Sequence, residues 1–374
     1  MALRIGIMAR GDSAAVGGVN RYIANIIPAL LSIDQRNEYV VYYDHPSHLG
    51  ENPAAIEKVI KLPSKMLYDH VALPMQTRRD KIDVLFCTKN VVPPLVSCKS
   101  VVTVHDLGYM VDKKHYHPLD TLYMNLAIRW SMRKGSAIIA ISQNTKKDLI
   151  SLLGTKEEKI HCVYFGINSE YRPIENREYL EGVRDKYDLP SEFILAISSL
   201  QRRKNLPNLV KAFSLVKERP NVNHKLVIIG VPLWQNSSVF DEINTSPVKD
   251  EIMWLKYVPE EDLPAIYNLA SALAFPSLYE GFGFPLLESM ACGCPVICSN
   301  TSSLPEIAGD AAVLIDPMSV EQLADGIISI LSDDSLREDL TNKGLERASN
   351  FTWEKTAKET LNVFEAVYTN KSKA

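Results

Sequence analysis

Two glutamates stand eight positions apart in the stretch SLYEGFGFPLLESMACGCPVI. The strand-like ALAF before it, the glycine-containing turn and the helical run LLESMAC predict that Glu280 lies in a loop and Glu288 in the first turn of a helix. Carboxylates accept hydrogen bonds from hydroxyl groups and repel phosphates, so their expected partners are the hydroxyls of a hexose or a ribose. Gly281 and Gly283 remove side chains where the backbone would approach such a ligand.

Other chemistries suit this stretch less well. Glycosidases place two carboxylates on opposite sides of the scissile bond, about 5 to 10 Å apart, whereas both glutamates here come from one short segment. Cys292, Cys294 and Cys298 have a C-x-C-x-x-x-C spacing that is not a zinc pattern, and no histidine follows at ligand distance, so we expect no metal site. The plainest alternative is a helix whose dipole favours a glutamate near its N-terminus.

A second group with chemical potential is the basic cluster Arg202, Arg203 and Lys204. It follows the strand-like FILAIS and precedes a helix that we expect to begin near Asn205 and Pro207. Cations at this position are unfavourable, because the helix dipole and the unpaired N–H groups already make a helix N-terminus positive. A bound anion such as diphosphate would remove the conflict; the alternative is that the three side chains extend into water.

The first half of the chain offers fewer candidates. Gly17 and Gly18 open the first long helix, where backbone groups can approach a phosphate or an acceptor. No G-x-G-x-x-G motif occurs there, which argues against a nicotinamide dinucleotide site. His105 and Asp106 end a strand-like run, VVTVH, but a lone histidine is as readily structural as catalytic.

These residues sit among elements that alternate between strand and helix, a pattern that predicts βαβ units and parallel sheets. We expect the following strands: RIGIMA, YVVYYD, DVLFC, SVVTVH, AIIAIS and HCVYFG in the first half, and FILAIS, KLVIIG, MWLKYV, ALAF, PVICS and AVLID in the second. In such sheets, ligands bind at the carboxyl ends of the strands, and two facing sheets would place those ends on opposite walls of a cleft.

The length of 374 residues exceeds what a single core usually supports, so we expect two domains. We predict an N-terminal domain over 1–170 and a second domain over 171–351, because the charged segment 168–192 has two prolines and lacks a strand signal. A final helix over 352–370 begins at Thr352. Apolar residues at helical spacing should form its packing face: Trp353, Ala357, Leu361, Phe364 and Tyr368.

Composition excludes several classes of protein. The formal net charge is only −4 and like charges do not cluster in long blocks, so a nucleic-acid partner is not expected. Six cysteines in a chain of this length do not form a disulfide scaffold. With no signal peptide or apolar run long enough to cross a membrane, we expect a cytoplasmic protein, and contact with the inner membrane surface stays open.

The stretch around Glu280 and Glu288 resembles the E-x7-E signature of the retaining glycosyltransferases of family 4. Five further segments resemble parts of those enzymes in the same order: VVTVHDL, AIIAISQNTKKDLI, YFGIN, RRKNLPNLVKAF and SSLPEIAGDAAVLIDP. The resemblance implies the GT-B fold, with two facing Rossmann-like domains, a donor nucleotide bound mainly by the second, an acceptor bound mainly by the first, and a C-terminal helix returning to the first. It also implies no cofactor and no metal; in agreement, no D-x-D motif is found.

The resemblance also implies roles for individual residues. Carried over by position, they are: Glu288 on the ribose hydroxyls, Glu280 on the donor hexose, Arg203 and Lys204 on the diphosphate, the amides of Phe282, Gly283 and Phe284 near the sugar and phosphate, His105 beside the hexose, and Gly17 and Gly18 at the donor–acceptor junction. Ser198 and Ser199 depart from the family pattern of a glycine followed by a small or basic residue, so backbone contacts there are less defined.

The expected activity is transfer of a hexose, with retention, from a nucleotide diphosphate sugar to a hydroxyl of a saccharide or lipid-linked saccharide, in surface polysaccharide or glycoconjugate synthesis. Family habit favours GDP-mannose over a UDP-hexose. Two alternatives stay open: a sugar-nucleotide epimerase or hydrolase that would use His105, Asp106 and Glu280 as acid and base, and a noncatalytic carbohydrate-assembly protein. The segment KMLYDHVALPMQTRRDK offers a mixed apolar and basic face to a membrane, but the favoured explanation is an ordinary amphipathic helix packed on the sheet.

Overall fold

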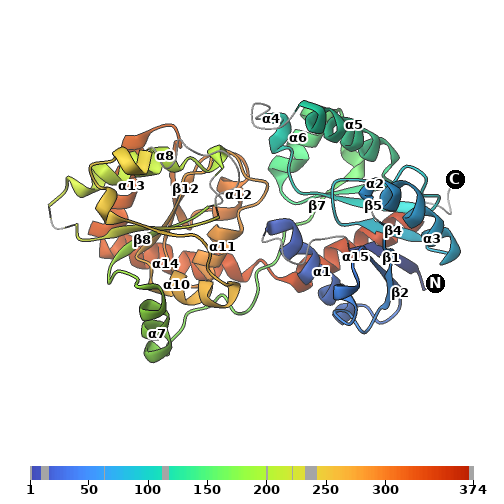
Figure 1. Cartoon of the computed structure of the whole chain (residues 1–374), viewed down its shortest axis with the longest axis horizontal. Coiled ribbons are helices and arrows are strands. Elements are labelled where there is room, and N and C mark those ends of the chain that lie inside the picture. Colours follow the sequence, from blue (N-terminus) through green and yellow to red (C-terminus); the bar gives the residue numbers. More distant parts are fainter. Residues whose placement is uncertain are drawn as a thin grey trace. The chain divides into compact units, whose positions relative to one another are not determined.

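The computed structural model describes residues 2–9, 17–62, 64–111, 118–198, 201–220, 222–231 and 242–369. The chain divides into two compact units: unit 1 comprises Met1–Gly166 with Thr352–Ala374, and unit 2 comprises Ile167–Phe351. Each unit is built on its own parallel sheet (Figure 1). Ser199 lies outside the described residues.

Unit 1 contains a seven-stranded sheet in the order β3-β2-β1-β4-β5-β6-β7, with every neighbouring pair parallel. Its strands are β1 Arg4–Met8, β2 Glu38–Tyr43, β3 Ile56–Val59, β4 Val84–Cys87, β5 Lys99–Val104, β6 Ala137–Ala140 and β7 Ile160–Cys162. The sequence pattern predicts all of them except β3. That edge strand, IEKV, has two charged residues among four and is only partly buried, so it lacks the continuous apolar run of the others.

Helices cover both faces of this sheet. The helical segments of unit 1 are α1 Gly18–Ile33, η1 Pro46–His48, α2 Lys65–Leu67, η2 Tyr68–Ala72, α3 Leu73–Arg79, α4 Gly108–Val111, α5 Pro118–Lys134, α6 Gln143–Leu153, η4 Glu157–Lys159 and α15 Trp353–Thr369. One core cluster joins one face of the sheet to side chains from η2, α3, α4, α5 and α6. On the other face α1 and α15 lie side by side (Figure 1).

The C-terminal helix α15 packs on unit 1, as the resemblance implies. Thr352 caps it, since its Oγ1 accepts a hydrogen bond from the Lys355 amide at 3.2 Å. The predicted packing face is only partly correct. The buried residues are Thr356, Ala357, Thr360, Val363, Phe364 and Val367. Thr356 can be buried because its hydroxyl has a hydrogen-bond acceptor nearby: Thr356 Oγ1 donates to the Tyr164 carbonyl at 2.8 Å.

Unit 2 contains a six-stranded parallel sheet in the order β10-β9-β8-β11-β12-β13. Its strands are β8 Phe193–Ile197, β9 Lys225–Ile229, β10 Ile252–Leu255, β11 Ala272–Phe275, β12 Val296–Ser299 and β13 Ala312–Ile315. All six follow predicted apolar runs, and most of their residues are buried. Parallel strands, with helices between them in the chain, confirm the Rossmann-like class for both units.

The helical segments of unit 2 are α7 Arg177–Tyr187, η5 Arg202–Lys204, α8 Leu206–Lys217, η6 Lys249–Glu251, η7 Glu260–Asp262, α10 Leu263–Leu269, α11 Phe284–Ala291, α12 Leu304–Ala308, α13 Val320–Ser332 and α14 Asp334–Ser349. Side chains of α8 and α13 share a core cluster with the sheet. Within the part of the chain that the structure describes, no helix combines the length and the apolar character needed to cross a lipid bilayer.

Candidate functional site

The carboxyl ends of β8 and β11 carry the two groups that the sequence singles out. These strands are neighbours in the unit 2 sheet, so the residues that follow them meet at one edge. The basic cluster forms the short helix η5 after β8, and the Glu280 loop follows β11. The backbone joins the two segments directly, because the Leu278 amide donates to the Arg203 carbonyl at 2.7 Å.

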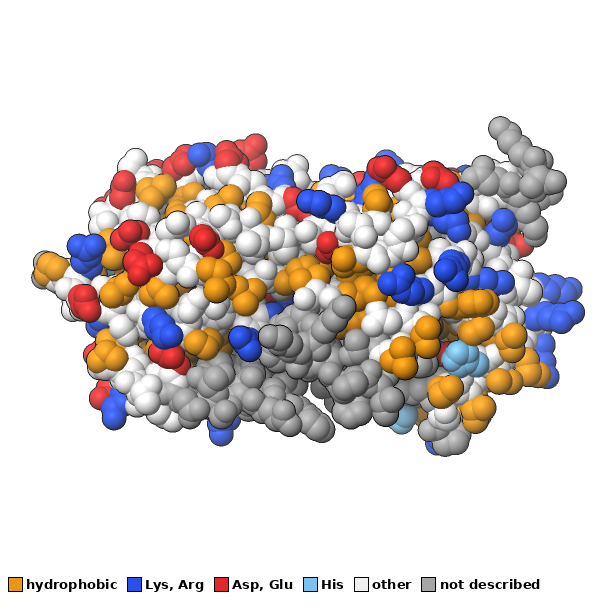
Figure 2. All heavy atoms as spheres, turned by 90° about the horizontal axis from the view of Figure 1, so that it is seen from above, with side chains coloured by type: hydrophobic (Ala, Val, Ile, Leu, Met, Phe, Trp, Pro, Cys, Tyr) orange, Lys and Arg blue, Asp and Glu red, His pale blue; other side chains and the backbone are white. Residues whose placement is uncertain are grey.

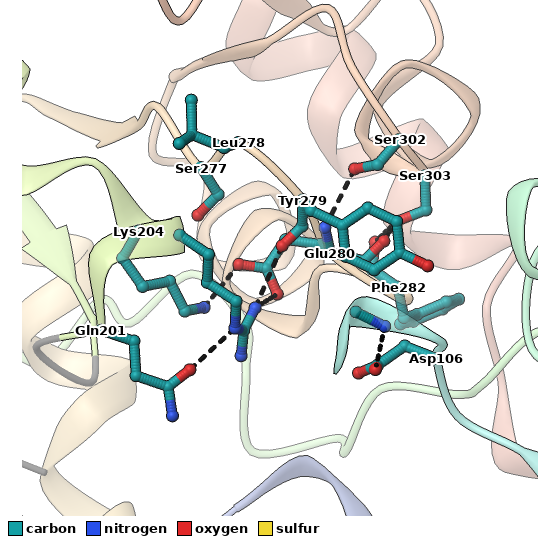
Figure 3. A network of polar contacts seen from close by, with 12 residues as sticks. Asp106, Gln201, Lys204, Ser277, Leu278, Tyr279, Glu280, Phe282, Ser302 and Ser303 are labelled. Carbon is teal, nitrogen blue, oxygen red and sulfur yellow. Dashed lines mark hydrogen bonds and ion pairs between the residues drawn. The ribbon is translucent and has the colours of Figure 1, made fainter. Parts of the chain in front are cut away.

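Glu280 pairs with two cations of η5. Its Oε2 accepts from Arg203 Nη1 at 2.8 Å, and its Oε1 lies 2.6 Å from Lys204 Nζ. Figure 3 shows the Lys204 and Glu280 side chains pointing toward one another. Arg203 is held further by Gln201 Oε1 at 2.7 Å and by the Tyr279 carbonyl at 3.1 Å. Arg203 and Lys204 are therefore fixed in a network with Glu280, whereas Arg202 is exposed.

This network is largely buried. Glu280 is 7% exposed, and the Lys204 and Arg203 side chains are 11% and 29% exposed. Burial alone would raise the pKa of Glu280, but the charges of Lys204 and Arg203 outweigh it, and its pKa is lowered below the usual value. Lys204 Nζ also lies 4.8 Å from the centre of the Phe275 ring. Glu280 thus stays ionised, and the group of three carries a net charge of +1.

Residues of the next loop hold the Glu280 backbone in place. The Glu280 amide donates to Ser302 Oγ at 3.0 Å, and Ser303 Oγ donates to the carbonyls of Glu280 and Phe282 at 3.0 and 2.8 Å. Figure 3 shows both serines beside this loop. Gly283 adopts a φ of 116°, a conformation that favours glycine. The loop is therefore rigidly supported by polar side chains that the sequence pattern does not reveal.

The start of α8 resolves the predicted charge conflict in part. Asn205 precedes the helix with a φ of 59°, and its side chain donates to the Pro317 carbonyl at 2.7 Å instead of capping the helix. The cations of η5 thus lie beside a helix N-terminus that has no side-chain cap. Glu280 places one negative charge beside these cations, so the protein itself supplies part of the negative charge that the sequence predicts there.

Glu288 lies in the second turn of α11 rather than the first, because the helix begins at Phe284 after Gly283. Its side chain is buried, and its Oε2 accepts a hydrogen bond from the Tyr267 hydroxyl at 2.7 Å. Tyr267 comes from α10 and packs against Tyr171, with ring centres 6.0 Å apart. The two glutamates therefore have different partners: Glu280 bonds to cations and Glu288 to a phenol.

His105 in unit 1 is 7% exposed and its Nε2 donates to the Thr88 carbonyl at 2.8 Å. Burial lowers its pKa to about 4, so the ring is neutral near pH 7 and carries its proton on Nε2. Tyr22 packs edge-on against it at 5.3 Å. A neutral imidazole with this tautomer offers Nδ1 as a hydrogen-bond acceptor and does not supply a positive charge.

The other unit 1 candidates have plainer surroundings. Asp106 Oδ1 accepts from the Gly108 amide at 2.9 Å, as an aspartate before a short helix commonly does. Gly17 precedes α1 in ordinary extended backbone, and no atom of the residues that the structure describes, its chain neighbours aside, lies within 4 Å of where a Cβ would stand. Gly18 is the first residue of α1.

The three clustered cysteines are buried free thiols. Burial raises the pKa of Cys294 and of Cys298 to about 12, and it also raises the pKa of Cys292. Protonated thiols are poor metal ligands. Within the described ranges, no three His, Cys, Asp or Glu side chains are grouped so that they could hold a metal ion.

The structure brings together Arg203, Lys204 and Glu280, and places Glu288 on the helix that follows the Glu280 loop. His105, Gly17 and Gly18 belong to unit 1. The predicted site lacks several supporting residues: Gln201, Tyr267, Tyr279, Ser302 and Ser303. Tyr267 carries no local signal because it is 21 positions from Glu288, and only the fold makes them neighbours.

Comparisons with known proteins agree with this fold. The model of the family described as Glycosyltransferase Family 4 matches residues 16–171, and that of Glycosyl transferases group 1 matches residues 183–347. O-antigen chain mannosyltransferase B of Escherichia coli is 33% identical over 288 residues, covering 76% of this chain and 75% of that protein. Serotype-specific mannosyltransferase WbdA of Escherichia coli is 29% identical over 268 residues, which are 70% of this chain but only 33% of WbdA.

Among solved structures, the fold is similar to that of Anabaena Alr3699/HepE in complex with UDP and glucose, with a TM-score of 0.77 and 17% identity. The similarity covers 97% of this chain and 100% of that one. Two Rossmann-like units with this likeness define the GT-B fold. The matched ranges and the relationship to the E. coli mannosyltransferase establish that the chain belongs to glycosyltransferase family 4.

Proposed function

We propose that this protein is a retaining mannosyltransferase that uses GDP-mannose and extends a surface polysaccharide or a lipid-linked saccharide without a metal ion. The observation that carries the proposal is the buried network of Arg203, Lys204 and Glu280 at the strand ends of unit 2. The choice of mannose is supported by the two Escherichia coli relatives, whose names describe mannosyltransferases of O-antigen or serotype-specific chains. The guanine base rests on family habit.

The network suits a diphosphate. Two cations and one carboxylate leave a net charge of +1, so phosphate oxygens can add to the network without the loss of Glu280. Arg203 is the more exposed cation and can bond two oxygens at once, whereas Lys204 acts as a buried point charge. The uncapped N-terminus of α8 lies next to them in the chain and adds N–H groups.

Glu288 is the residue proposed to bind the ribose hydroxyls. The bond from Tyr267 fixes one of its carboxylate oxygens, so the side chain is held in one orientation before the nucleotide arrives. Glu280 and the amides of Phe282, Gly283 and Phe284 are proposed to contact the hexose and phosphate. In unit 1, the neutral His105 is proposed to accept a hydrogen bond from a hexose hydroxyl through Nδ1.

The proposed reaction breaks the bond between the anomeric carbon and the diphosphate oxygen. The acceptor oxygen forms its new bond on the same face of the sugar, and its proton passes to the departing phosphate. Negative charge then grows on the diphosphate, where Lys204 and Arg203 stabilise it. Because these cations are already held by Glu280 and Gln201, little reorganisation accompanies that step.

Calorimetry of the full chain with GDP, UDP, ADP and their sugar conjugates tests the donor site, with and without EDTA. We expect selective binding of GDP and GDP-mannose that EDTA does not change and that Glu288→Ala weakens. Binding of UDP-hexose in their place would replace the donor but keep the site. The same affinity for every nucleotide in wild type and in Glu288→Ala would refute the donor site.

Product analysis tests the reaction. Incubation with GDP-mannose and a mannose-containing acceptor should give an α-linked product, which retention requires, and NMR of the new anomeric proton reports it. A β-linked product would refute retention. Release of free mannose at the same rate with and without acceptor would favour a hydrolase.

A further inference from the structure

The helices that cover one face of the unit 1 sheet expose an unusual number of large apolar side chains. We call the exposed side of α2–α3, which includes η2, together with that of α5, the outer face of unit 1. Its exposed apolar residues are Met66, Leu67, Val71 and Met75 from α2–α3 and Leu122, Leu126 and Trp130 from α5. Their exposed fractions run from 43% for Val71 to 62% for Leu126.

These side chains are not a continuation of the core. Tyr68 and Leu73 of the first segment and Ile128 and Met132 of the second point inward and join one cluster against the sheet. Because both helical segments cover the same face of the sheet, their exposed apolar residues lie on the side away from it. A monomer in water gains nothing from exposing seven such side chains, and large exposed apolar patches mark interaction sites.

Among the side chains that the structure describes on the outer face, the exposed charges all have one sign. Its exposed charged side chains, among those that the structure describes in 64–81 and 118–134, are Arg78, Arg79, Lys81, Arg129, Arg133 and Lys134. The described carboxylates of these segments, Asp69 and Asp80, are buried, and Asp80 is paired with Lys58. Figure 2 shows hydrophobic and basic side chains lying together on the surface of unit 1.

A surface that is both apolar and cationic fits one kind of partner better than others. A second copy of the same face would bring like charges together, which disfavours a symmetric dimer. An anionic bilayer satisfies both features, since the apolar side chains enter the boundary of the acyl chains and the cations remain among the headgroups. Trp130 suits that boundary, because its ring is apolar and its indole N–H remains available to polar groups.

We propose that the outer face of unit 1 docks on an anionic lipid bilayer. Docking does not require the proposed donor or acceptor to be correct. If both are correct, docking holds the enzyme at the surface where a lipid-anchored saccharide would be found. Basic residues near a charged membrane surface contribute about 1 kcal/mol each, which is about fivefold in affinity, so removal of two should weaken binding by roughly 30-fold at low salt.

The test is sedimentation of the full chain with vesicles of phosphatidylcholine alone or with added phosphatidylglycerol. We expect binding to the anionic vesicles that salt reduces, and little to the neutral ones. Arg129→Gln with Arg133→Gln should weaken binding about 30-fold, and Met75→Gln with Leu126→Gln should weaken it at low and high salt alike. The matched control is Arg177→Gln with Tyr179→Gln on α7 of unit 2, where both residues are also exposed; it should bind like wild type.

Trp130 provides a second readout. Its fluorescence should shift to the blue and be quenched by brominated lipid on binding, and Trp130→Phe should remove that signal while sedimentation persists. No sedimentation with anionic vesicles, or equal sedimentation of both double variants and wild type, would overturn the proposal. So would a dimer in light scattering that Leu126→Gln converts to a monomer, because a second copy would then be the occupant.

Discussion

Replacing Tyr267 by phenylalanine isolates the contact that orients Glu288. The substitution removes one hydroxyl and keeps the ring, so it leaves almost no cavity. The Tyr267 hydroxyl donates to Glu288 Oε2 at 2.7 Å in a fully buried position. A hydrogen bond to a charged group contributes about 1.5–3 kcal/mol to stability. For a unit of this size, 1 kcal/mol lowers Tm by about 2–4 °C, so we expect Tm to fall by about 3–12 °C.

The second effect is on ligand binding. If Glu288 binds the ribose, loss of its orienting bond should weaken GDP binding by about tenfold, because the carboxylate must then be ordered when the nucleotide binds. Tyr39→Phe is a matched control. The Tyr39 hydroxyl donates to Asp34 Oδ2, also at 2.7 Å and also buried, but in unit 1. Tyr39→Phe should lower Tm by a similar amount and leave GDP affinity unchanged.

Calorimetry for GDP and thermal unfolding, applied to both variants, separate the two effects. Loss of stability in both variants with unchanged GDP affinity in both would show that Tyr267 is only structural and would refute its positioning role. An unchanged Tm in Tyr267→Phe would refute the energetic argument itself. Equal loss of GDP affinity in both variants would mean that destabilisation alone explains the change.

Further predictions concern the cations, the metal and the histidine. Lys204→Ala should remain folded, because Glu280 keeps Arg203 as a partner, and should lose about 10²–10³-fold in transfer rate, whereas Lys211→Ala on the exposed side of α8 should not; circular dichroism and an initial-rate assay measure both. Transfer should persist in EDTA after dialysis, and a loss restored by Mg²⁺ would contradict metal independence. His105 has a pKa of about 4 when folded and about 6.5 when unfolded, so between these values the unfolded chain binds the extra proton. Its contribution is complete above pH 6.5 and is lost as the pH falls to 4, by up to about 3 kcal/mol. Urea unfolding across this range should show a shallower decline in His105→Asn, and parallel curves would contradict the burial argument.

Most of the fold follows from the sequence because the strands of both sheets, β3 excepted, coincide with apolar runs. The sequence does not predict β3, because an edge strand buries less and its IEKV sequence carries charge. The packing face of α15 was partly wrong because helical spacing alone does not show that Thr356 and Thr360 are buried. In both cases the missing information is which neighbour satisfies a polar group, and that depends on tertiary structure.

The site shows the same limit. The sequence predicts the cations Arg203 and Lys204 and the carboxylate Glu280 as separate groups with separate ligands. Arg203 and Glu280 are 77 positions apart in the sequence, and they follow different strands. The adjacency of β8 and β11 is what joins them. No pattern of residues indicates that Ser303 supports the Glu280 loop, since a serine suits any loop equally well.

The network changes the meaning of the charge conflict before α8. A cluster of cations at a helix N-terminus predicts either an external anion or side chains that extend into water, yet the structure supplies Glu280 from the neighbouring loop. Complete neutralisation would have left no attraction for a phosphate, and no counter-charge would have left buried Lys204 with an uncompensated cost of desolvation. One carboxylate for two cations lies between these limits. It holds Lys204 in one orientation, and in the proposed reaction the remaining positive charge would favour the diphosphate most when the negative charge of the diphosphate is largest, which is as the sugar departs.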